Sequence, residues 1–462
     1  MSISLDNYKN YFFLGIGGIS MSALALIMHR RGYGVSGYDR RCTEATKKLE
    51  GEGICVYYTH DASHCRKSDI CVFSAAFHED NEEMKAVRDA GIPMISRAEL
   101  LGSIAGDYPN SIAVAGTHGK STTSGMLSQI FLSSRSSDPT ILVGAELPAI
   151  SSTFRTGKDG NFIFEACEYM DSFLQFYPTV CVVLNVEYDH TDYFHSIEQM
   201  TASFTRFLKN SKSKTAIVNA DSPHALEAAR NSGCMIHTYA LNDTSAEFTA
   251  ASITFNEGHA SFDVERNGQF LLHADLSVPG THNISNALAA VAAAVISDVS
   301  TDAIREGLHA FCGVCRRFEY KGKCGGANVY DDYAHHPQEI AATLEAARRI
   351  CTGRIIAVFE PHTYTRLHDF LPEFAKALSA ADVVFIAPIY AAREENIYNY
   401  TSRTLSSLIP GAQGFDTFEQ TQSAVCTVAK KGDLILTMGA GDINRFAAKL
   451  VEAPSSVGKT KG

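Results

Sequence analysis

Residues 114–123 have the sequence VAGTHGKSTT, and their pattern predicts a strand, a glycine turn and then a helix. In this arrangement backbone N–H groups and the positive end of the helix face an anion, while Lys120 reaches the outer phosphates of a nucleotide. The hydroxyl of Ser121 can ligate Mg²⁺. We expect the lysine to be solvated when no nucleotide is bound. The alternative is an ordinary strand–helix turn with a surface lysine, because the GxxGK[ST] spacing is shorter than the usual GxxxxGK[ST].

A second strand–turn–helix pattern opens the chain. Residues 11–14 predict a short strand, residues 15–18 (GIGG) a turn, and residues 19–30 an apolar helix. The turn nearly matches GxGxxG, with Ser20 at the third glycine, and Asp39 follows at the distance where such folds hold a ribose hydroxyl. The pattern favours a phosphate-bearing nucleotide but does not distinguish NAD from a UDP-sugar. A chance glycine turn is the alternative.

Apolar runs alternate with helical stretches along most of the chain, which predicts an α/β fold with parallel sheets. Three alternating segments between residues 249 and 278 predict an antiparallel meander, and two helices follow as far as Phe311. The length predicts about three domains. The expected strands lie near residue 35 and at 70–73, 94–95, 111–115, 162–164, 180–186, 215–219, 329–331, 355–359, 383–387 and 434–438. The expected domains are residues 1–107, 108–315 and 316–462, with a linker at 106–110 and a frayed tail at 453–462.

The composition is that of an ordinary globular protein, with 45% hydrophobic and 20% charged residues. A net charge of −11 argues against a non-specific nucleic-acid binder or a membrane-surface protein. The longest apolar stretch, residues 287–296, is too short to span a membrane, and the N-terminus lacks signal-peptide features, so we expect a cytoplasmic protein. Twelve scattered cysteines argue against a disulfide framework. The CxxC pair Cys312 and Cys315, with Cys324 nearby, is a weak zinc or redox signal.

Two residues that end predicted strands are candidate Mg²⁺ ligands beside Ser121. Glu165 follows one strand directly, and His190 follows the strand that ends near Asn185. Residues at the carboxyl ends of neighbouring parallel strands converge on the crevice where ligands bind. Alone, each is more commonly a solvated loop charge, but together with the phosphate loop they predict a metal site. Glu168 competes with Glu165, because it lies three residues further on and could share a helical face with it.

Two polar clusters follow neighbouring strands in the last part of the chain. One is DDYAHHP at residues 331–337, and the other is FEPHTYTR at residues 359–366. Carboxylates, imidazoles and an arginine at adjacent strand ends suit a polyanionic substrate. The histidines could instead bind zinc, although His335 and His336 are adjacent and point differently. The arginine pair at 316–317 lies at the expected hinge, where a mobile domain could bring a cation to a transferring phosphate.

Together these segments resemble the Mur ligase family. Nine motifs in family order and at family-like spacing are a highly specific match and cover nearly the whole chain. The matching motifs are GIGGISMSALA (15–25), GTHGKSTT (116–123), EACEY (165–169), LNVEYDHTDYF (184–194), PGTHNISNALAA (279–290), RRFE (316–319), DDYAHHPQE (331–339), FEPHTYTR (359–366) and GAGDI (439–443).

The resemblance implies a Rossmann-like N-terminal domain that binds a UDP-sugar, a central P-loop-type ATPase domain with a mostly parallel sheet, and a Rossmann-like C-terminal domain that closes over the site. It is nearest to the members that join L-alanine to the lactyl carboxylate of UDP-N-acetylmuramate through an acyl phosphate, in peptidoglycan precursor synthesis. ATP and Mg²⁺ are the implied cofactors. UDP-N-acetylmuramate and L-alanine are the implied partners, with no nucleic acid and no membrane, and a monomer or weak homodimer is expected.

Matching motif by motif, the resemblance also implies the site residues. The implied ATP contacts are Gly116, Thr117, His118, Gly119, Lys120, Ser121, Thr122, Asn283, Asn286, Arg317 and Asp332, with His282 also near the adenine. Arg317 would approach the γ-phosphate, and Asp332 would hold the ribose. The implied Mg²⁺ ligands are Ser121, Glu165 and His190. The implied substrate contacts are Gly15, Gly17, Gly18, Asp39, Ser74, Tyr333, His335 and Arg366. The implied catalytic residues are Lys120, His190, Arg317, His335 and Arg366.

Three positions depart from the family pattern. Ser121 stands where many members have threonine and keeps the hydroxyl, Thr363 stands where many alanine-adding members have arginine, and Cys167 replaces a common aspartate. Other functions stay open at this point. A relative that adds a whole peptide to UDP-N-acetylmuramate is the nearest, and a non-catalytic nucleotide sensor is a rival from another class. An NAD-dependent dehydrogenase fits only the first part of the chain.

Overall fold

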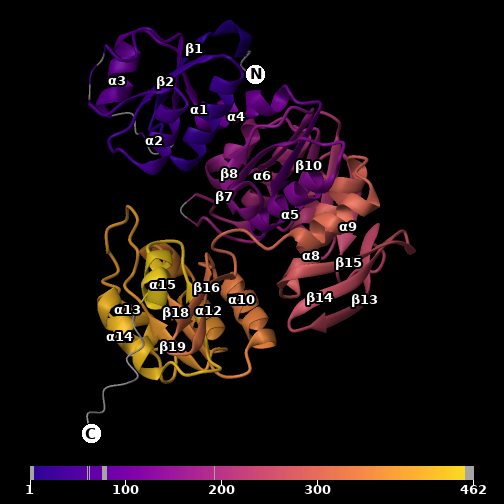
Figure 1. Cartoon of the computed structure of the whole chain (residues 1–462), viewed down its shortest axis with the longest axis vertical. Coiled ribbons are helices and arrows are strands. Elements are labelled where there is room, and N and C mark those ends of the chain that lie inside the picture. The colour runs from indigo at the N-terminus through magenta and orange to yellow at the C-terminus, as the bar shows by residue number, and fades with distance from the viewer. Residues whose placement is uncertain are drawn as a thin grey trace. The chain divides into compact units, whose positions relative to one another are not determined.

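The computed structural model describes residues 5–59, 61, 63–74, 77, 81–191 and 193–452 (Figure 1). The chain divides into two compact units. One comprises Met1–Val186, Met200–Thr238 and Val291–Ala303, and the other comprises Glu187–Gln199, Tyr239–Ala290 and Ile304–Gly462. The tail expected at 453–462 lies outside the described residues. The three domain boundaries expected from the sequence stay a prediction.

The first sheet has five parallel strands in the order β3-β2-β1-β4-β5. Its central strand β1 buries all four residues of Tyr11–Leu14, as expected for a parallel strand covered on both faces. The strands are β1 (Asn10–Leu14), β2 (Gly34–Tyr38), β3 (Cys55–Tyr57), β4 (Ile70–Phe73) and β5 (Met94–Ser96). The helices are η1 (Leu5–Asn7), α1 (Ile19–Arg30), α2 (Glu44–Gly51), α3 (Glu82–Asp89) and α4 (Arg97–Gly106).

The second sheet has ten strands in the order β15-β14-β13-β12-β11-β10-β6-β9-β7-β8. Strands β7, β9, β6, β10 and β11 pair in parallel, whereas β13, β14 and β15 form the expected antiparallel meander. The strands are β6 (Asn110–Ala115), β7 (Thr140–Leu147), β8 (Ser152–Arg155), β9 (Asn161–Glu165), β10 (Val180–Val183), β11 (Thr215–Asn219), β12 (Met235–Ala240), β13 (Phe248–Asn256), β14 (His259–Arg266) and β15 (Gln269–Pro279). The helices are α5 (Lys120–Ser133), η2 (Pro148–Ile150), η3 (Tyr169–Gln175), α6 (Ile197–Lys209), α7 (Pro223–Arg230), α8 (His282–Ile296) and α9 (Thr301–Ala310).

The third sheet has six strands in the order β16-β17-β21-β18-β19-β20. Alternate residues of β18 enter two separate cores: Ile355, Ala357 and Phe359 pack with α10 and α12, whereas Ile356 and Val358 pack with α14 and α15. The strands are β16 (Glu319–Cys324), β17 (Ala327–Asp332), β18 (Ile355–Phe359), β19 (Val383–Ile386), β20 (Gln413–Gly414) and β21 (Leu434–Met438). The helices are α10 (Pro337–Ile350), α11 (Tyr364–Asp369), α12 (Leu371–Leu378), α13 (Ser402–Ser406), α14 (Phe418–Val428) and α15 (Ile443–Glu452).

The α/β class predicted from the sequence is confirmed, but some elements differ. Strand β10 ends at Val183 rather than at residue 186, because the following residues turn to contact the phosphate loop. The expected linker at 106–110 shortens to residues 107–109, since α4 continues through Gly106 and β6 starts at Asn110. The prediction missed six strands, namely β3, β7, β8, β12, β16 and β20.

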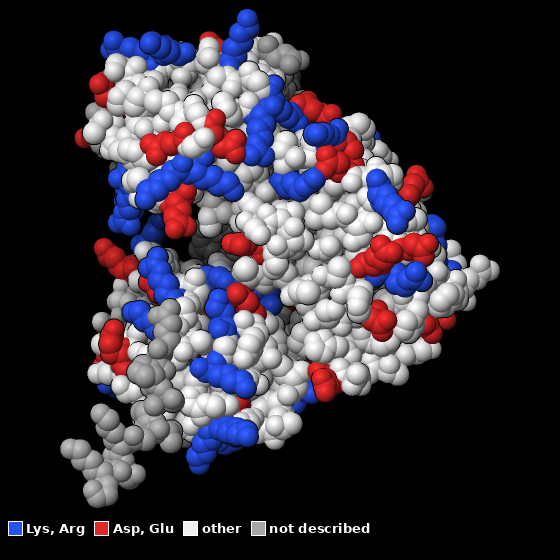
Figure 2. Space-filling view, viewed as in Figure 1, with Lys and Arg blue, Asp and Glu red and all other residues white. Residues whose placement is uncertain are grey.

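The surface of the protein mixes both signs of charge. On the face drawn in Figure 2, acidic side chains lie among basic ones over much of the visible surface. Among the helices that the structure describes, none combines the length and the apolar character needed to cross a bilayer.

Candidate active site

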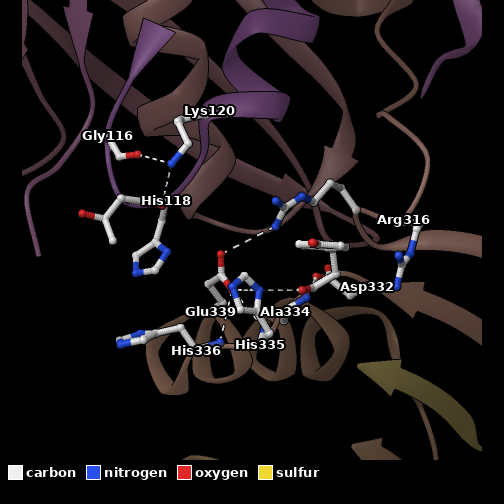
Figure 3. Close-up of polar contacts among 12 residues, drawn as sticks. Gly116, His118, Lys120, Arg316, Asp332, Ala334, His335, His336 and Glu339 are labelled. Atoms are coloured by element: carbon white, nitrogen blue, oxygen red, sulfur yellow. Dashed lines mark hydrogen bonds and ion pairs between the residues drawn. The ribbon is translucent and has the colours of Figure 1, made fainter. Parts of the chain in front are cut away.

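The glycine turn predicted at residues 116–119 joins β6 to α5 (Figure 3). Gly116 has φ +145° and Gly119 has φ +85°, and residues other than glycine rarely adopt these backbone conformations. A Cβ atom on Gly116 would also lie 2.9 Å from Cβ of Leu184. Because α5 begins at Lys120, the first N–H groups of this helix lie at the turn and can receive an anion.

Asn185 holds the phosphate loop in shape. Its side-chain oxygen accepts the N–H of His118 at 2.8 Å, and its side-chain nitrogen donates to the carbonyl of the same residue at 3.1 Å. Its backbone carbonyl accepts the N–H of Thr117 at 3.1 Å. Sequence reasoning missed this role, although the position of Asn185 just beyond a strand end was the available signal.

Lys120 is mostly buried, which corrects the expectation of a solvated lysine. Its side chain is 16% exposed and forms an ion pair with Glu168, whose side chain is 0% exposed. The Nζ atom lies 3.1 and 2.9 Å from the two carboxylate oxygens, and it also donates to the carbonyls of Gly116 and Thr117. Burial lowers the pKa of Lys120, but the charge of Glu168, the hydrogen bond to it and the contributions of Cys167 and Glu165 together outweigh burial and raise it overall.

Glu165 ends β9 with a half-buried side chain that faces the start of α5. Its Oε1 accepts the backbone N–H of Gly144 and the hydroxyl of Ser124, the latter at 3.3 Å. Ser121 lies in the first turn of α5 and is 8% exposed. The structure therefore places two predicted hard-oxygen ligands beside the phosphate loop. Burial raises the pKa of the neighbouring Cys167 thiol, which favours its neutral form.

The N-terminal glycine turn is closed by the end of β2. The carbonyl of Tyr38 accepts the N–H groups of Gly15 and Ile16 at 2.8 and 3.1 Å. Asp39 Oδ2 accepts the N–H of Gly17 at 2.9 Å, and a Cβ on Gly17 would lie 2.8 Å from this oxygen. The predicted turn and the predicted acid thus lie together.

The remaining predicted residues of this nucleotide site lie on neighbouring elements. Gly18 precedes the first helical residue of α1. Ser74 directly follows β4, the strand beside β1, and is half-buried. Both are therefore at the carboxyl-end side of the first sheet, where nucleotides bind in such folds.

Arg366 of α11 is held by two side chains of the second unit. Its Nη2 donates to Asp189 Oδ1 at 3.0 Å, and its Nη1 lies 3.2 Å from Nδ1 of His362. The Nε atom is buried and has no hydrogen-bond partner among the described residues, which suits a group that receives an anionic ligand. Burial raises the pKa of Asp189, but Arg366 and smaller contributions from neighbouring histidines together outweigh burial and lower it. His190 follows directly with φ +53°, and its N–H donates to Asp189 at 2.7 Å.

Asp332, at the end of β17, is buried but well bonded. Its two carboxylate oxygens accept the backbone N–H groups of Ala334 and Phe318 at 2.8 and 2.9 Å. Burial raises the pKa of Asp332 to about 6, and the charge of Arg317 opposes this rise. The carboxylate can therefore accept bonds from a ribose near neutral pH, as the resemblance implies.

The two hinge arginines have different surroundings. The Arg316 guanidinium lies 4.7 Å from the ring centre of Tyr333 and donates to the carbonyl of Gly439 at 2.8 Å. The Arg317 guanidinium lies 5.2 Å from the same ring. Tyr333 therefore packs against both cations, and the RRFE and DDY motifs meet.

His335 is neutral and has a defined tautomer. Its Nδ1 lies 3.0 Å from the carbonyl of Tyr333 and 3.2 Å from Oε2 of Glu339. Because both neighbours are acceptors, Nδ1 carries the hydrogen, and Nε2 is left to accept a bond. Burial lowers the pKa of His335 to about 3 and that of His362 to about 4. The two rings lie with their centres 5.9 Å apart, so the predicted strand-end clusters do converge.

Glu360 was not predicted as a site residue, although it follows β18 directly. Its carboxylate accepts the N–H groups of Gly441, Asp442 and Ile443 at 3.1, 3.1 and 3.2 Å, where α15 begins. The residue is 1% exposed, and burial raises its pKa to about 7. The side chain thus occupies the N-terminus of this helix.

The residues predicted near the adenine begin α8. Asn283 donates to the carbonyl of Pro279 at 2.7 Å, and Asn286 donates to the Asn283 side chain at 3.0 Å. Burial lowers the pKa of His282 to about 4, so its ring is neutral. The structure brings these three polar side chains together at one helix start.

Three family domains match the chain. The Mur ligase family catalytic domain matches residues 10–109, the Mur ligase middle domain residues 114–294, and the Mur ligase glutamate ligase domain residues 316–441. The chain is 45% identical to the UDP-N-acetylmuramate–L-alanine ligase of Acetivibrio thermocellus, over 95% of this chain and 94% of the relative. The corresponding ligase of Agathobacter rectalis is 43% identical, over 95% and 97%. The chain belongs to the Mur ligase family.

Solved structures of similar proteins share the fold of this Mur ligase. The UDP-N-acetylmuramate–alanine ligase of Thermotoga maritima has a TM-score of 0.79 at 27% identity, covering 96% of this chain and 98% of that protein. A murein peptide ligase of Psychrobacter arcticus has a TM-score of 0.72 at 25% identity, covering 97% and 99%. The three-domain α/β fold that the resemblance implied is confirmed.

The Mg²⁺ ligands of this Mur ligase stay a prediction. Ser121 and Glu165 belong to the first unit, and His190 belongs to the second. In the part of the chain that the structure describes, no three His, Cys, Asp or Glu side chains gather as a metal site.

Proposed function

We propose that this Mur ligase joins L-alanine to the lactyl carboxylate of UDP-N-acetylmuramate while ATP becomes ADP and phosphate. The main support is 45% identity over 95% of the chain to a relative named for this reaction. A phosphate loop whose lysine is held between loop carbonyls and a buried glutamate supports the use of ATP.

ATP supplies the phosphoryl group that turns the unreactive carboxylate into an acyl phosphate. The backbone N–H groups at the start of α5 would receive the phosphates, and Lys120 and Arg317 would neutralise the charge that develops on the moving phosphoryl group. To contact phosphate, Lys120 has to exchange at least part of its bonding with Glu168. Asp332 would hold the ribose, and Asn283 would lie near the adenine.

The residues present fit a Mg²⁺ ion beside the phosphate loop. A carboxylate from Glu165 and a hydroxyl from Ser121 are the hard oxygen donors that this ion prefers. Glu165 ends a strand that pairs with β6, the strand leading into the loop. We therefore propose Ser121 and Glu165 as ligands, with His190 as a weaker third. When bound, Mg²⁺ would neutralise phosphate charge.

In the second step the alanine amine attacks the carbonyl carbon, phosphate leaves with the electrons of the broken C–O bond, and the nitrogen loses a proton. Arg366 is suited to a substrate carboxylate or phosphate, because its buried Nε–H has no partner among the residues described. Nε2 of His335 is suited to accept a bond from the amine. Holding amine and acyl phosphate together contributes through proximity. Tyr333 would complete this side of the site, and Gly15, Gly17, Gly18, Asp39 and Ser74 would contact the UDP group.

The decisive experiment measures phosphate release from ATP with UDP-N-acetylmuramate and a panel of amino acids and one cell-wall tripeptide. Release should require the sugar nucleotide and be greatest with L-alanine. Equal release without the sugar nucleotide would contradict a ligase. Preference for the tripeptide would instead assign the peptide-adding reaction, and saturable micromolar NADH binding would revive the dehydrogenase. We further propose a cytoplasmic enzyme that is a monomer or weak homodimer, which analytical ultracentrifugation tests.

A further inference from the structure

Glu339 caps α10, lies 3.2 Å from Nδ1 of His335 and also faces a cation. It is the third residue of α10, and Oε2 accepts the N–H groups of His335 and His336 at 3.0 and 3.3 Å, which caps the helix (Figure 3). The other oxygen, Oε1, lies 3.7 Å from Nη1 of Arg317. The cap therefore fixes the carboxylate, and the fixed carboxylate faces a cation.

Arg317 lies near both that carboxylate and an aromatic ring. Its side chain is 26% exposed, that of Glu339 is 10% exposed, and the guanidinium lies 5.2 Å from the ring centre of Tyr333. The nearby Asp332 accepts two backbone N–H groups, which hold its carboxylate in place. A guanidinium on a flexible stem has many conformations, and these two neighbours restrict it.

We propose that Glu339 is a positioning residue for phosphoryl transfer, holding the Arg317 guanidinium in the orientation in which it meets the γ-phosphoryl group. The proposal rests on the proposed function, since it needs a transferring phosphoryl group. The ion pair at 3.7 Å is too loose to immobilise the arginine by itself. It acts together with the Tyr333 ring and leaves the other guanidinium N–H groups to the phosphate.

Replacement of Glu339 by glutamine separates the helix cap from the negative charge, which faces both Arg317 and the ring of His335. A glutamine oxygen still accepts the capping N–H groups, whereas the negative charge toward Arg317 is lost. Glu99 provides a matched control, because it caps α4 in the same way: it accepts the N–H of Ser96 at 2.7 Å and sits at the same third helical position. E99Q therefore measures how much stability and activity change when a capping glutamate becomes glutamine.

The experiment measures kcat and the KM for ATP in the full-length wild type, E339Q, E99Q, R317A and the double variant R317A/E339Q. E339Q should lower kcat by about 10- to 100-fold, the scale expected for a misplaced catalytic group, with the KM for ATP changed by less than about threefold. E99Q should match the wild type within about twofold, with a shift in melting temperature like that of E339Q. In the R317A background, E339Q should cause no further loss.

The outcomes separate the inference from the function on which it rests. A wild type without alanine-dependent phosphate release overturns the proposed function. With an active wild type, an E339Q variant that behaves like E99Q overturns the positioning role. A further loss on adding E339Q to R317A also overturns it, because Glu339 would then act through another group, such as His335. R317A removes the other partner of the contact and leaves the helix cap intact, and melting temperatures of the four proteins of this double-mutant cycle show whether the kinetic comparison is made on folded enzyme.

Discussion

Replacing Lys120 with alanine should damage stability as well as catalysis, because the structure pairs this lysine with a buried acid. Glu168 is 0% exposed and faces Lys120 with both carboxylate oxygens. Removing the cation leaves a buried charge without its counter-ion, which typically costs about 3–5 kcal/mol of unfolding free energy. The loss of a preorganised cation on the phosphate path should separately lower turnover by about 10²–10⁴.

Two assays separate these effects. Urea unfolding gives the stability of wild type and K120A, and phosphate release gives turnover under conditions where each variant is folded. The double variant K120M/E168Q, which removes both charges, is the matched control. It should recover most of the lost stability, because neither buried charge remains, and none of the turnover.

The effect of K120A on stability and its effect on turnover can each be refuted separately. A K120A protein whose unfolding free energy stays within about 1 kcal/mol of wild type would refute the buried pair, since that is the scale of an ordinary substitution. A folded K120A protein with near-normal turnover would refute the phosphate role and leave the pair as a structural feature.

Three further predictions follow from the site. E165A should sharply raise the Mg²⁺ concentration needed for activity, H190A should raise it less, and E168A should raise it least. If titration of activity against Mg²⁺ shows a larger shift for E168A than for E165A, our choice of ligand is wrong. N185A removes the bonds that shape the phosphate loop and should raise the KM for ATP about tenfold, whereas an unchanged value would show that the loop keeps its shape alone. The pKa of Glu360 is raised from 4.5 to about 7, so its contribution to stability is complete below pH 4.5 and lost as pH rises through 7. Between pH 4.5 and 8 the unfolding free energy of wild type should therefore fall relative to E360Q by up to about 3 kcal/mol in urea titrations, and equal pH slopes would contradict the shift.

Much of the fold was predictable because the chain follows simple local patterns. The helix at Ile19–Arg30 and the strands at Ile355–Phe359 and Leu434–Met438 were placed at their observed limits, since their apolar periods are long or continuous. Two of the missed strands lack this signal. β12 has four residues that are not fully buried, and β16 has one buried residue in six, so neither shows a clear period.

The motifs of the site were predictable from the sequence, but the ion pairs between distant residues were not. The glycine turn, Glu165 and the two strand-end clusters follow from sequence, because strand ends and glycines mark them. The ion pair of Asp189 with Arg366 joins residues 177 positions apart, and that of Lys120 with Glu168 joins residues 48 apart. No local pattern reports such contacts, and so the sequence suggested a solvated Lys120.

The glutamate at the start of α15 bears on how an inhibitor of this enzyme could be designed. The segment Gly439–Ile443 leads into a helix and has the small residues of an anion-binding turn, yet Glu360 already fills it with a carboxylate of the protein's own chain. A phosphate mimic aimed there would have to displace a buried carboxyl group that already accepts three N–H groups. The loop before α5 presents a cation instead of a carboxylate at its helix start. Anionic groups in a compound library should therefore be built toward Lys120, and uncharged hydrogen-bond acceptors toward the rim of α15.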